Sequence, residues 1–395
     1  MTNYIFATDE QKELADLARQ ICEAQLKPQL AELEKADNGL GAYPYDVHKA
    51  LAEAGFYGMA IPEEYGGLGF DRVTQGVILE EIAKIDAGFA FDFYNMGNFL
   101  PAILETSIPQ EEKQMWADRI LSGEGMGCFG ITESEAGSDA AAMKSTATFD
   151  EATNEWVING NKCFITGAPE ANFFLTCAWT DKTQRASKGV TAFFVEKERG
   201  VQVGKKENKM GLKLSQTAEV IYDDVRVPAD HVIGKPGEGF GRALGIISGD
   251  GRPMGSVVCL GIAQAALDAA IDYAKGRRQF GKRIIDHEGL AFLIADMKNR
   301  TDAARAMLYQ TLEAMDRGLA NPTMIAGTKT FVADTTMQTA VDAVQVLGGY
   351  GYMKEYPVEK YMRDAKIFQI FSGTNQIQRR NIVKAIAGRD PEAKR

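Results

Sequence analysis

The chain has 395 residues, of which 45% are hydrophobic and 25% are charged, a composition typical of a soluble globular protein rather than a disordered or fibrous one. Its net charge of −10 includes no basic patch, which argues against nucleic-acid binding. Five scattered cysteines and three histidines lack metal-ligand spacing, so we expect reduced thiols and no metal. Without a leader pattern or a membrane-spanning run, a cytoplasmic location and no membrane segment are expected.

The first part of the chain has a helical pattern. Thr8 and Gln11 have the spacing of a capping box, and apolar residues then recur at helical spacing over 14–21, before Pro28. A Gly/Pro cluster at 61–69 interrupts the pattern without ending it. These features predict a mainly helical domain over residues 1–122.

The middle part has the pattern of strands. Residues 156–165 predict two β runs around an Asn159–Gly160 hairpin turn, and further runs follow at 190–195 and 219–227. We therefore predict an antiparallel β domain over residues 123–233.

Long amphipathic segments return after Pro228. They cover about 253–275, 290–317 and 322–347, lengths that suit a helical bundle. The C-terminal domain is therefore predicted over residues 234–395, and the fold class is α+β.

The segment 128–139 offers a candidate binding turn. An apolar strand runs into a Gly/Ser/Asp-rich turn that carries the hydroxyls of Thr132 and Ser138. Backbone N–H groups and short hydroxyl side chains in such turns bind anions, so phosphates or ring oxygens are possible ligands. A plain β-turn is the alternative interpretation.

Several longer motifs, in order along the chain, resemble those of acyl-CoA dehydrogenases. They lie at 164–166, 209–211 and 224–228 in the middle part, and at 277–282, 345–351 and 361–379 near the C-terminus. The resemblance implies an oxidoreductase with an N-terminal α domain, a middle antiparallel β domain and a C-terminal four-helix bundle. It also implies FAD as cofactor, an acyl-CoA thioester as substrate, a homotetramer, and an electron-transfer flavoprotein as electron acceptor.

The resemblance assigns roles to the matching residues of this sequence. The flavin ring would be contacted by Thr132, Phe164 and Thr166, and the phosphate end of FAD by Thr374 and Gln376. The residues that would reach the FAD of a neighbouring subunit are Arg277, Phe280, Gln345 and Gly349. The residues that would lie along the substrate are Ser138, Arg252, Phe371 and Gly373.

The catalytic base of the family is missing from its usual place. Most members have a carboxylate before the Gly-Thr of the closing motif, where this chain has Ser372, and a minority have it before the matching arginine, where this chain has Gly251. A serine hydroxyl is too weak a base without an activating partner. The backbone N–H of Ser372 can still bind a thioester oxygen and stabilise an enolate.

Two aspartates are candidates for the displaced base. Asp92 lies in a stretch that, by resemblance, lines the acyl end of the pocket, where burial of a carboxylate would raise its pKa toward that of a useful base. Asp250 is one position from Gly251, and an α-helix would turn it about 100° away from that site.

With Asp92 as a distal base, the proton would leave a carbon acidified through conjugation. Hydride transfer to flavin N5 from another allylic carbon would then complete a 1,4-elimination on a cyclic unsaturated thioester. This combination resembles the cyclohexenecarboxyl-CoA (cyclohex-1-ene-1-carboxyl-CoA) dehydrogenases of anaerobic aromatic-acid metabolism. The alternatives are an ordinary 1,2-dehydrogenation of a saturated cyclic or branched acyl-CoA with Asp250 as base, and a non-catalytic flavin-bearing binding protein.

Overall fold

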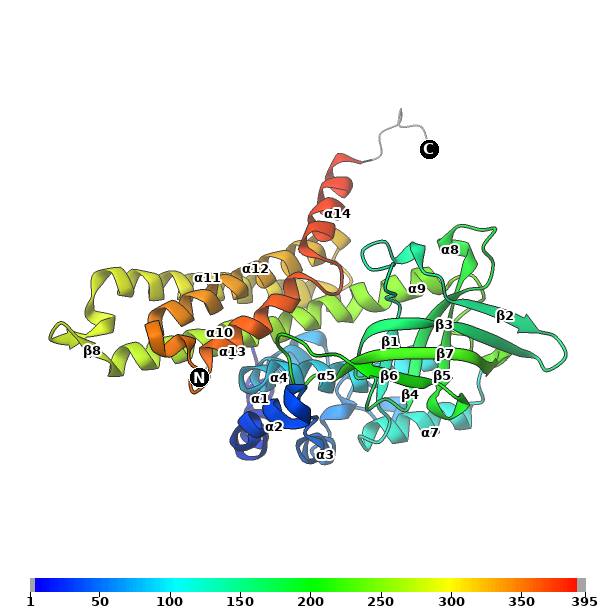
Figure 1. The fold of residues 1–395 in the computed structure, drawn as a ribbon, viewed down its shortest axis with the longest axis horizontal. Coiled ribbons are helices and arrows are strands. Elements are labelled where there is room, and N and C mark those ends of the chain that lie inside the picture. The colour runs from blue at the N-terminus through cyan, green and yellow to red at the C-terminus, as the bar shows by residue number, and fades with distance from the viewer. Residues whose placement is uncertain (1–3, 389–395) are drawn as a thin grey trace.

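The computed structural model describes residues 4–388 and contains three groups of elements (Figure 1). The first group consists of the helices α1 (Asp9–Ile21), α2 (Leu30–Gly39), α3 (Tyr45–Glu53), α4 (Arg72–Ile85), α5 (Ala87–Gly97), α6 (Leu100–Leu104) and α7 (Gln110–Leu121). The second contains the strands β1 (Gly127–Gly130), β2 (Thr146–Asp150), β3 (Glu155–Thr166), β4 (Phe173–Trp179), β5 (Val190–Glu196), β6 (Gln202–Lys206) and β7 (Thr217–Pro228), with the short helix α8 (Ala186–Gly189).

The third group is helical apart from one small hairpin. Its elements are α9 (Gly239–Ile246), α10 (Arg252–Gly276), β8 (Arg278–Gln279), β9 (Lys282–Arg283), α11 (Glu288–Asp316), α12 (Pro322–Leu347), α13 (Val358–Ala365) and α14 (Asn375–Ala387). A π-helical turn, Ile247–Gly251, joins α9 to α10. The three long amphipathic segments predicted from the sequence are confirmed as α10, α11 and α12. The domain boundaries that we propose, after residues 122 and 233, fall in the connections between the three groups.

The N-terminal helices are fixed by local caps and by buried ion pairs, of which Glu80 gives an example. The predicted capping box is confirmed, because Thr8 Oγ1 accepts from the Gln11 N–H at 3.2 Å and Gln11 Oε1 accepts from the Thr8 N–H at 2.9 Å. On α4 the buried Glu80 accepts hydrogen bonds from Arg305 at 2.6 Å and from Tyr309 at 2.8 Å, both on α11. A buried carboxylate needs such partners, so this contact fastens the first group to the bundle.

The strands form one seven-stranded sheet, seen at the right of Figure 1. Its order is β1-β4-β2-β3-β7-β6, and β5 pairs with β4. The pairs β2/β3, β3/β7, β4/β5 and β6/β7 are antiparallel, as expected, whereas β1/β4 is parallel and β2/β4 makes one parallel contact. The sheet is therefore largely, but not wholly, antiparallel.

The predicted hairpin at Asn159–Gly160 is wrong. Strand β3 runs through both residues, and the chain reverses instead between β2 and β3, where Asp150 pairs with Glu155. The pairing of β3 with β7 shifts register at this point, and Gly160 has a φ of +151°. A Cβ atom there would lie 2.1 Å from Ser145 Oγ, so glycine serves a close backbone approach at a bulge rather than a turn.

Helix α5 lies at the centre of the molecule. All of its residues except Asn95 are buried, because it packs on α4, on α10 and on strand β1. Asp86 caps its start by accepting from the Phe89 N–H at 2.7 Å.

Helix α10 is also largely buried. The stretch Gly239–Gly276, which includes it, is long and apolar enough to cross a membrane, but most of that apolar stretch is packed inside the protein. Both helices are core elements.

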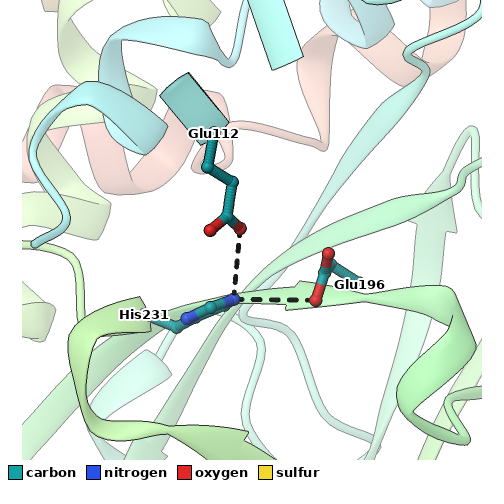
Figure 2. Close-up of side chains that lie close together, drawn as sticks. All are labelled: Glu112, Glu196 and His231. Carbon is teal, nitrogen blue, oxygen red and sulfur yellow. Dashed lines mark ion pairs between the residues drawn. The ribbon is translucent and has the colours of Figure 1, made fainter. Parts of the chain in front are cut away.

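An ion-pair cluster joins α7 to the edge of the sheet domain. Figure 2 shows the imidazole of His231 facing the carboxylates of Glu112, on α7, and Glu196, at the end of β5, with Nε2 at 3.8 and 3.6 Å from them. Its Nδ1 lies 2.9 Å from Asp230. Within residues 4–388 this is the only group of ligand-type side chains close enough to hold a metal, but Arg199 already lies 3.2 Å from Nε2 and pairs with Glu196. We therefore interpret the cluster as ionic.

The cluster predicts a pH-dependent stability. Burial alone would lower the pKa of His231, but hydrogen bonding to Glu196 and Asp230 outweighs it, so the pKa is raised. The pKa of His231 is therefore higher in the folded protein than in the unfolded chain, where it is about 6.5. The protonated imidazole stabilises the fold fully below the unfolded-state pKa, and this stabilisation is lost as the pH rises through the folded-state pKa. We expect the thermal midpoint of the wild type to fall as the pH rises above about 6.5, and His231→Asn to flatten this part of the profile. An unchanged slope in the variant would contradict this assignment.

Candidate active site

A cavity of about 240 Å³ opens where the sheet, α5 and the C-terminal segment meet. Its walls are built from five segments, and they are lined by Phe91, Tyr94, Asn95, Asn98, Phe99, Pro101 and Ala102, by Phe129, Ile131 and Thr132, by Phe164, Ile165 and Thr166, by Ile246, Ile247, Asp250 and Gly251, and by Phe371 and Ser372. A second cavity of about 250 Å³ shares Phe91, Phe164, Thr166 and Phe371 with it. Together they offer a mainly apolar space with polar groups at a few points.

The sheet brings Thr132, Phe164 and Thr166 to this cavity, from the end of β1 and the end of β3. A backbone hydrogen bond of 3.0 Å from Cys163 N–H to Thr132 O holds the two segments together. Phe164 has a φ of +58°, which is unusual for an aromatic residue, and its side chain is 64% exposed. A large aromatic side chain in a strained conformation at an open cavity is suited to contact a flat ligand.

The segment 371–373 closes the opposite wall. Phe371 stacks on Phe91 of α5, with ring centroids 4.8 Å apart. Ser372 and Gly373 both have left-handed backbones, with φ of +53° and +85°. The Ser372 carbonyl accepts from Arg252 Nε at 2.9 Å, and among the described residues its N–H donates to no protein acceptor. That N–H is therefore available to a ligand.

Asp92 is not among the residues that line the main cavity, and its role as base stays a prediction. The residues of α5 that line the cavity are Phe91, Tyr94 and Asn95, and Asp92 is not among them. Its carboxylate is fully buried and accepts from Ser215 Oγ at 2.5 Å and from the Gln216 N–H at 2.9 Å. Burial raises the pKa of Asp92 well above its usual range, as expected, and its partner Ser215 lines the second cavity.

Asp250 does line the cavity. It lies in the π-helical turn, in which the Arg252 N–H bonds to Ile247 O, so the register differs from the α-helical one used to predict its direction. Arg72 Nε donates to Asp250 Oδ1 at 3.0 Å, and Arg72 also pairs with Asp316 at 3.1 Å. Within residues 4–388, Oδ2 has no hydrogen-bond partner. Asp250 is the only carboxylate among the residues that line this cavity.

The residues predicted to serve a neighbouring subunit gather at the other end of the bundle. Arg277, Phe280 and Gly349 line one depression of about 630 Å³, whereas the exposed Gln345 lies outside its lining. Phe280 is 94% exposed. The hairpin β8/β9 beside it lies at the left of Figure 1, far from the sheet at the right. These residues therefore cannot contact a ligand in the main cavity of their own chain.

The remaining predicted site residues lie outside the lining of the main cavity. Thr374 caps α14 by accepting from the Ile377 N–H at 3.1 Å, and Gln376 follows it on the exposed side. Ser138 is exposed in the loop after β1. Sequence reasoning missed Arg72 and the buried Lys329, although a lysine inside the otherwise apolar and threonine-rich first half of α12 is a signal that something polar must face it.

Three sequence profiles match the chain. They are those of the acyl-CoA dehydrogenase N-terminal domain over residues 8–124, the middle domain over 128–225 and the C-terminal domain over 237–387. A Bacillus subtilis protein named acyl-CoA dehydrogenase is 38% identical over 384 residues, which are 96% of this chain and 99% of that protein.

Solved structures agree over nearly the whole chain. Butyryl-CoA dehydrogenase from Megasphaera elsdenii superposes with a TM-score of 0.90 at 35% identity, covering 98% of this chain and 100% of that one. A chain from a structure of the electron transferring flavoprotein of Acidaminococcus fermentans, described in terms of flavin-based electron bifurcation, has a TM-score of 0.90 at 37% identity, with 98% and 100% coverage.

The conformation of Gly373 gives a direct test of the site. With a φ of +85°, and with an added Cβ only 2.6 Å from Gln378 Nε2, alanine is strained here and displaces a bonded side chain. We expect Gly373→Ala to reduce the free energy of unfolding by about 1–3 kcal/mol, measured by denaturant or thermal unfolding. Gly276→Ala is the control, because an added Cβ meets nothing within 4 Å there. Equal stability of the two variants would contradict the described backbone.

Proposed function

The chain belongs to the acyl-CoA dehydrogenase family, and on that premise we propose that it oxidises a short, ring-shaped acyl group of a CoA thioester with Asp250 as the base. Members of the family are FAD-dependent oxidoreductases, so a non-catalytic binding protein is no longer a competing interpretation. The single observation that supports the base is that, among the described cavity-lining residues, only Asp250 has a carboxylate.

The chemistry requires a base, an acceptor for the hydride and a group that stabilises the enolate. When bound, FAD accepts the hydride. Thr132, Phe164 and Thr166 are the residues of this chain that would hold the flavin ring, because they converge on an apolar cavity with an exposed aromatic side chain. The free N–H of Ser372 would bind the thioester oxygen, which requires no side chain.

Asp250 would remove the proton. Arg72 fixes one of its oxygens and leaves the other available, so the carboxylate has a defined orientation toward the cavity. A positioned carboxylate is a common general base. The π-helical turn is the local feature that brings Asp250 to the cavity, and such turns occur frequently at functional sites.

The shape of the cavity supports a flat acyl group. Phe91, Tyr94, Phe99, Phe129 and Phe371 supply aromatic surface around it, and the stacked pair Phe91–Phe371 narrows it. We propose cyclohex-1-ene-1-carboxyl-CoA as substrate and a 1,4-elimination as reaction. The conjugated thioester would transmit acidity to a ring carbon facing Asp250, instead of the α carbon beside the vacated position of Ser372. None of the relatives described above is named for such a substrate.

A 1,2-dehydrogenation of a short saturated acyl-CoA is the second candidate. It is favoured by the similarity to a butyryl-CoA dehydrogenase and needs the same residues, with Asp250 acting on the α carbon.

Electron-transfer flavoprotein is the electron acceptor that we propose, supported by the similarity to a chain from the structure of that flavoprotein. A cytoplasmic homotetramer is the assembly that we propose.

Asp250→Asn tests the proposed base. We expect the rate of flavin reduction by cyclohex-1-ene-1-carboxyl-CoA to fall by about 10²–10⁴, with thioester binding retained, as measured by stopped-flow absorbance at the flavin band. Asp316→Asn is the matched control, since it removes the other partner of Arg72 without touching the cavity. Asp92→Asn should keep the rate within a few-fold.

The same assay with butyryl-CoA separates the two candidate reactions. Faster flavin reduction by butyryl-CoA than by the cyclohexene ester would favour the 1,2-dehydrogenation. Wild-type rates in Asp250→Asn, or loss of reduction in Asp92→Asn alone, would show that the base has been assigned to the wrong residue.

A second subunit is expected to complete the cofactor site. Arg277→Ala should weaken FAD binding about ten-fold, the effect of one lost charged hydrogen bond, while light scattering still shows a tetramer. Arg278→Ala is the control, because Arg278 bonds to Gly281 O and lies outside the lining of the depression. Full FAD affinity in the Arg277 variant, or a stable monomer that retains FAD, would contradict the shared site.

A further inference from the structure

We propose that Lys329 is a positioning residue for the acyl-CoA chemistry, because it fixes the Ser372–Gly373 segment and, together with Arg252, provides positive charge beside a thioester enolate. The inference rests on acyl-CoA binding in the main cavity, as the proposed function does. It does not depend on which residue is the base.

Four side-chain hydrogen bonds hold the two left-handed residues. Lys329 Nζ donates to Gly373 O at 3.0 Å, and Arg252 Nε donates to Ser372 O at 2.9 Å. The buried Gln378 donates through Nε2 to both carbonyls, at 3.2 and 3.1 Å. Because both carbonyl groups are held, the backbone of this segment is fixed, and among the described residues the Ser372 N–H donates to no protein acceptor.

The two cations near this segment lack negative partners. Lys329 is only 4% exposed, and its other hydrogen bond goes to Asn375 Oδ1, a neutral group, at 2.8 Å. Arg252 donates otherwise to the hydroxyl of Ser248 at 2.7 Å. Within residues 4–388 neither makes an ion pair, and the nearby Asp334 already pairs with Arg379. Burial lowers the pKa of Lys329 to about 8 and also lowers the pKa of Arg252.

These cations border the substrate space. Lys329 and Arg252 line a small cavity of about 10 Å³, enough for roughly one water molecule. That cavity shares Gly251, Phe371 and Ser372 with the main one. A buried cation without a counter-ion, such as Lys329, is unfavourable in the resting protein. An anion that forms next to Ser372 relieves this cost, which is how a site stabilises the charge of a reaction intermediate.

The step assisted in this way is enolate formation. The C–H bond at the carbon that the thioester acidifies, directly or through conjugation, breaks, its proton passes to the base, and the electron pair is delocalised onto the thioester oxygen. The negative charge then lies at the Ser372 N–H, within the field of Lys329 and Arg252. Lys329 acts through the segment that it holds and through its charge, without itself touching the thioester.

Acetoacetyl-CoA provides a test that needs no turnover, since its central carbon is acidic enough to ionise without a protein base. The holoenzyme is titrated with pH, and the bound enolate is measured by difference absorbance. We expect Lys329→Met to leave the affinity for free CoA unchanged and to reduce the enolate fraction at neutral pH about ten-fold, which corresponds to one pKa unit. Lys329→Arg should restore it, and Lys298→Met, on the exposed surface of α11, is the control.

A parallel loss of CoA and acetoacetyl-CoA binding in Lys329→Met, with no shift in the enolate titration, would overturn the proposal in favour of a purely structural lysine. If Lys329→Met does not fold, the wild type and Lys329→Arg decide the question. The wild type should lose enolate stabilisation as Lys329 deprotonates near pH 8, whereas the Arg variant should not. Identical profiles would overturn the proposal. If Asp250 proves not to be the base, the expected results stay the same, because acetoacetyl-CoA ionises without a protein base.

Discussion

The burial of helix α5 on all sides is the constraint on which the site depends. A helix packed against α4, α10 and β1 has no solvent face, so every polar group on it requires a partner from a neighbouring element. One face, with Phe91 and Tyr94, is left for the cavity. Asp92, which is not part of that lining, is supplied with hydrogen bonds by Ser215 and Gln216 and thereby ties the helix to the sheet domain.

The surroundings of Asp92 on α5 and those of Ser372 on the facing segment differ in the sign of their charge. Around Asp92 a buried carboxylate accepts two hydrogen bonds, and Lys209, which bonds to Ser215 O, lies close enough to interact with its charge. Around Ser372 the buried charges are positive, and only neutral oxygens face them. By resemblance, members of the family usually have a carboxylate at the position of Ser372. This chain has a serine there, so the positive charges of Lys329 and Arg252 have no negative partner at that position. This suits an anionic intermediate better than a resting carboxylate.

The molecule carries its predicted cofactor residues in two separate places. Thr132, Phe164 and Thr166 lie at the sheet, while Arg277 and Phe280 lie at the far end of the bundle (Figure 1). The length of α10, which runs between the two regions, makes contact with one ligand by both sets impossible within a chain. A shared site between copies is the arrangement that gives both sets a function, and it supports the tetramer proposed above.

The sequence by itself determined the order of helical and β segments, the long bundle helices and the capping box at Thr8, because periodicity and capping are local properties. It also determined the family, and with it the absence of a carboxylate at Ser372. It did not determine the Asn159–Gly160 geometry, since the contact that demands glycine comes from Ser145, which lies just before β2. Nor did it determine the base. Periodicity fixes which residues share a helical face, but not which face meets the cavity, so only the packing of α5 shows that Phe91 and Tyr94 line it and that Asp92 does not. The π-helical turn that brought Asp250 in leaves no periodic signal, and it is formed where two helices of the tertiary structure join.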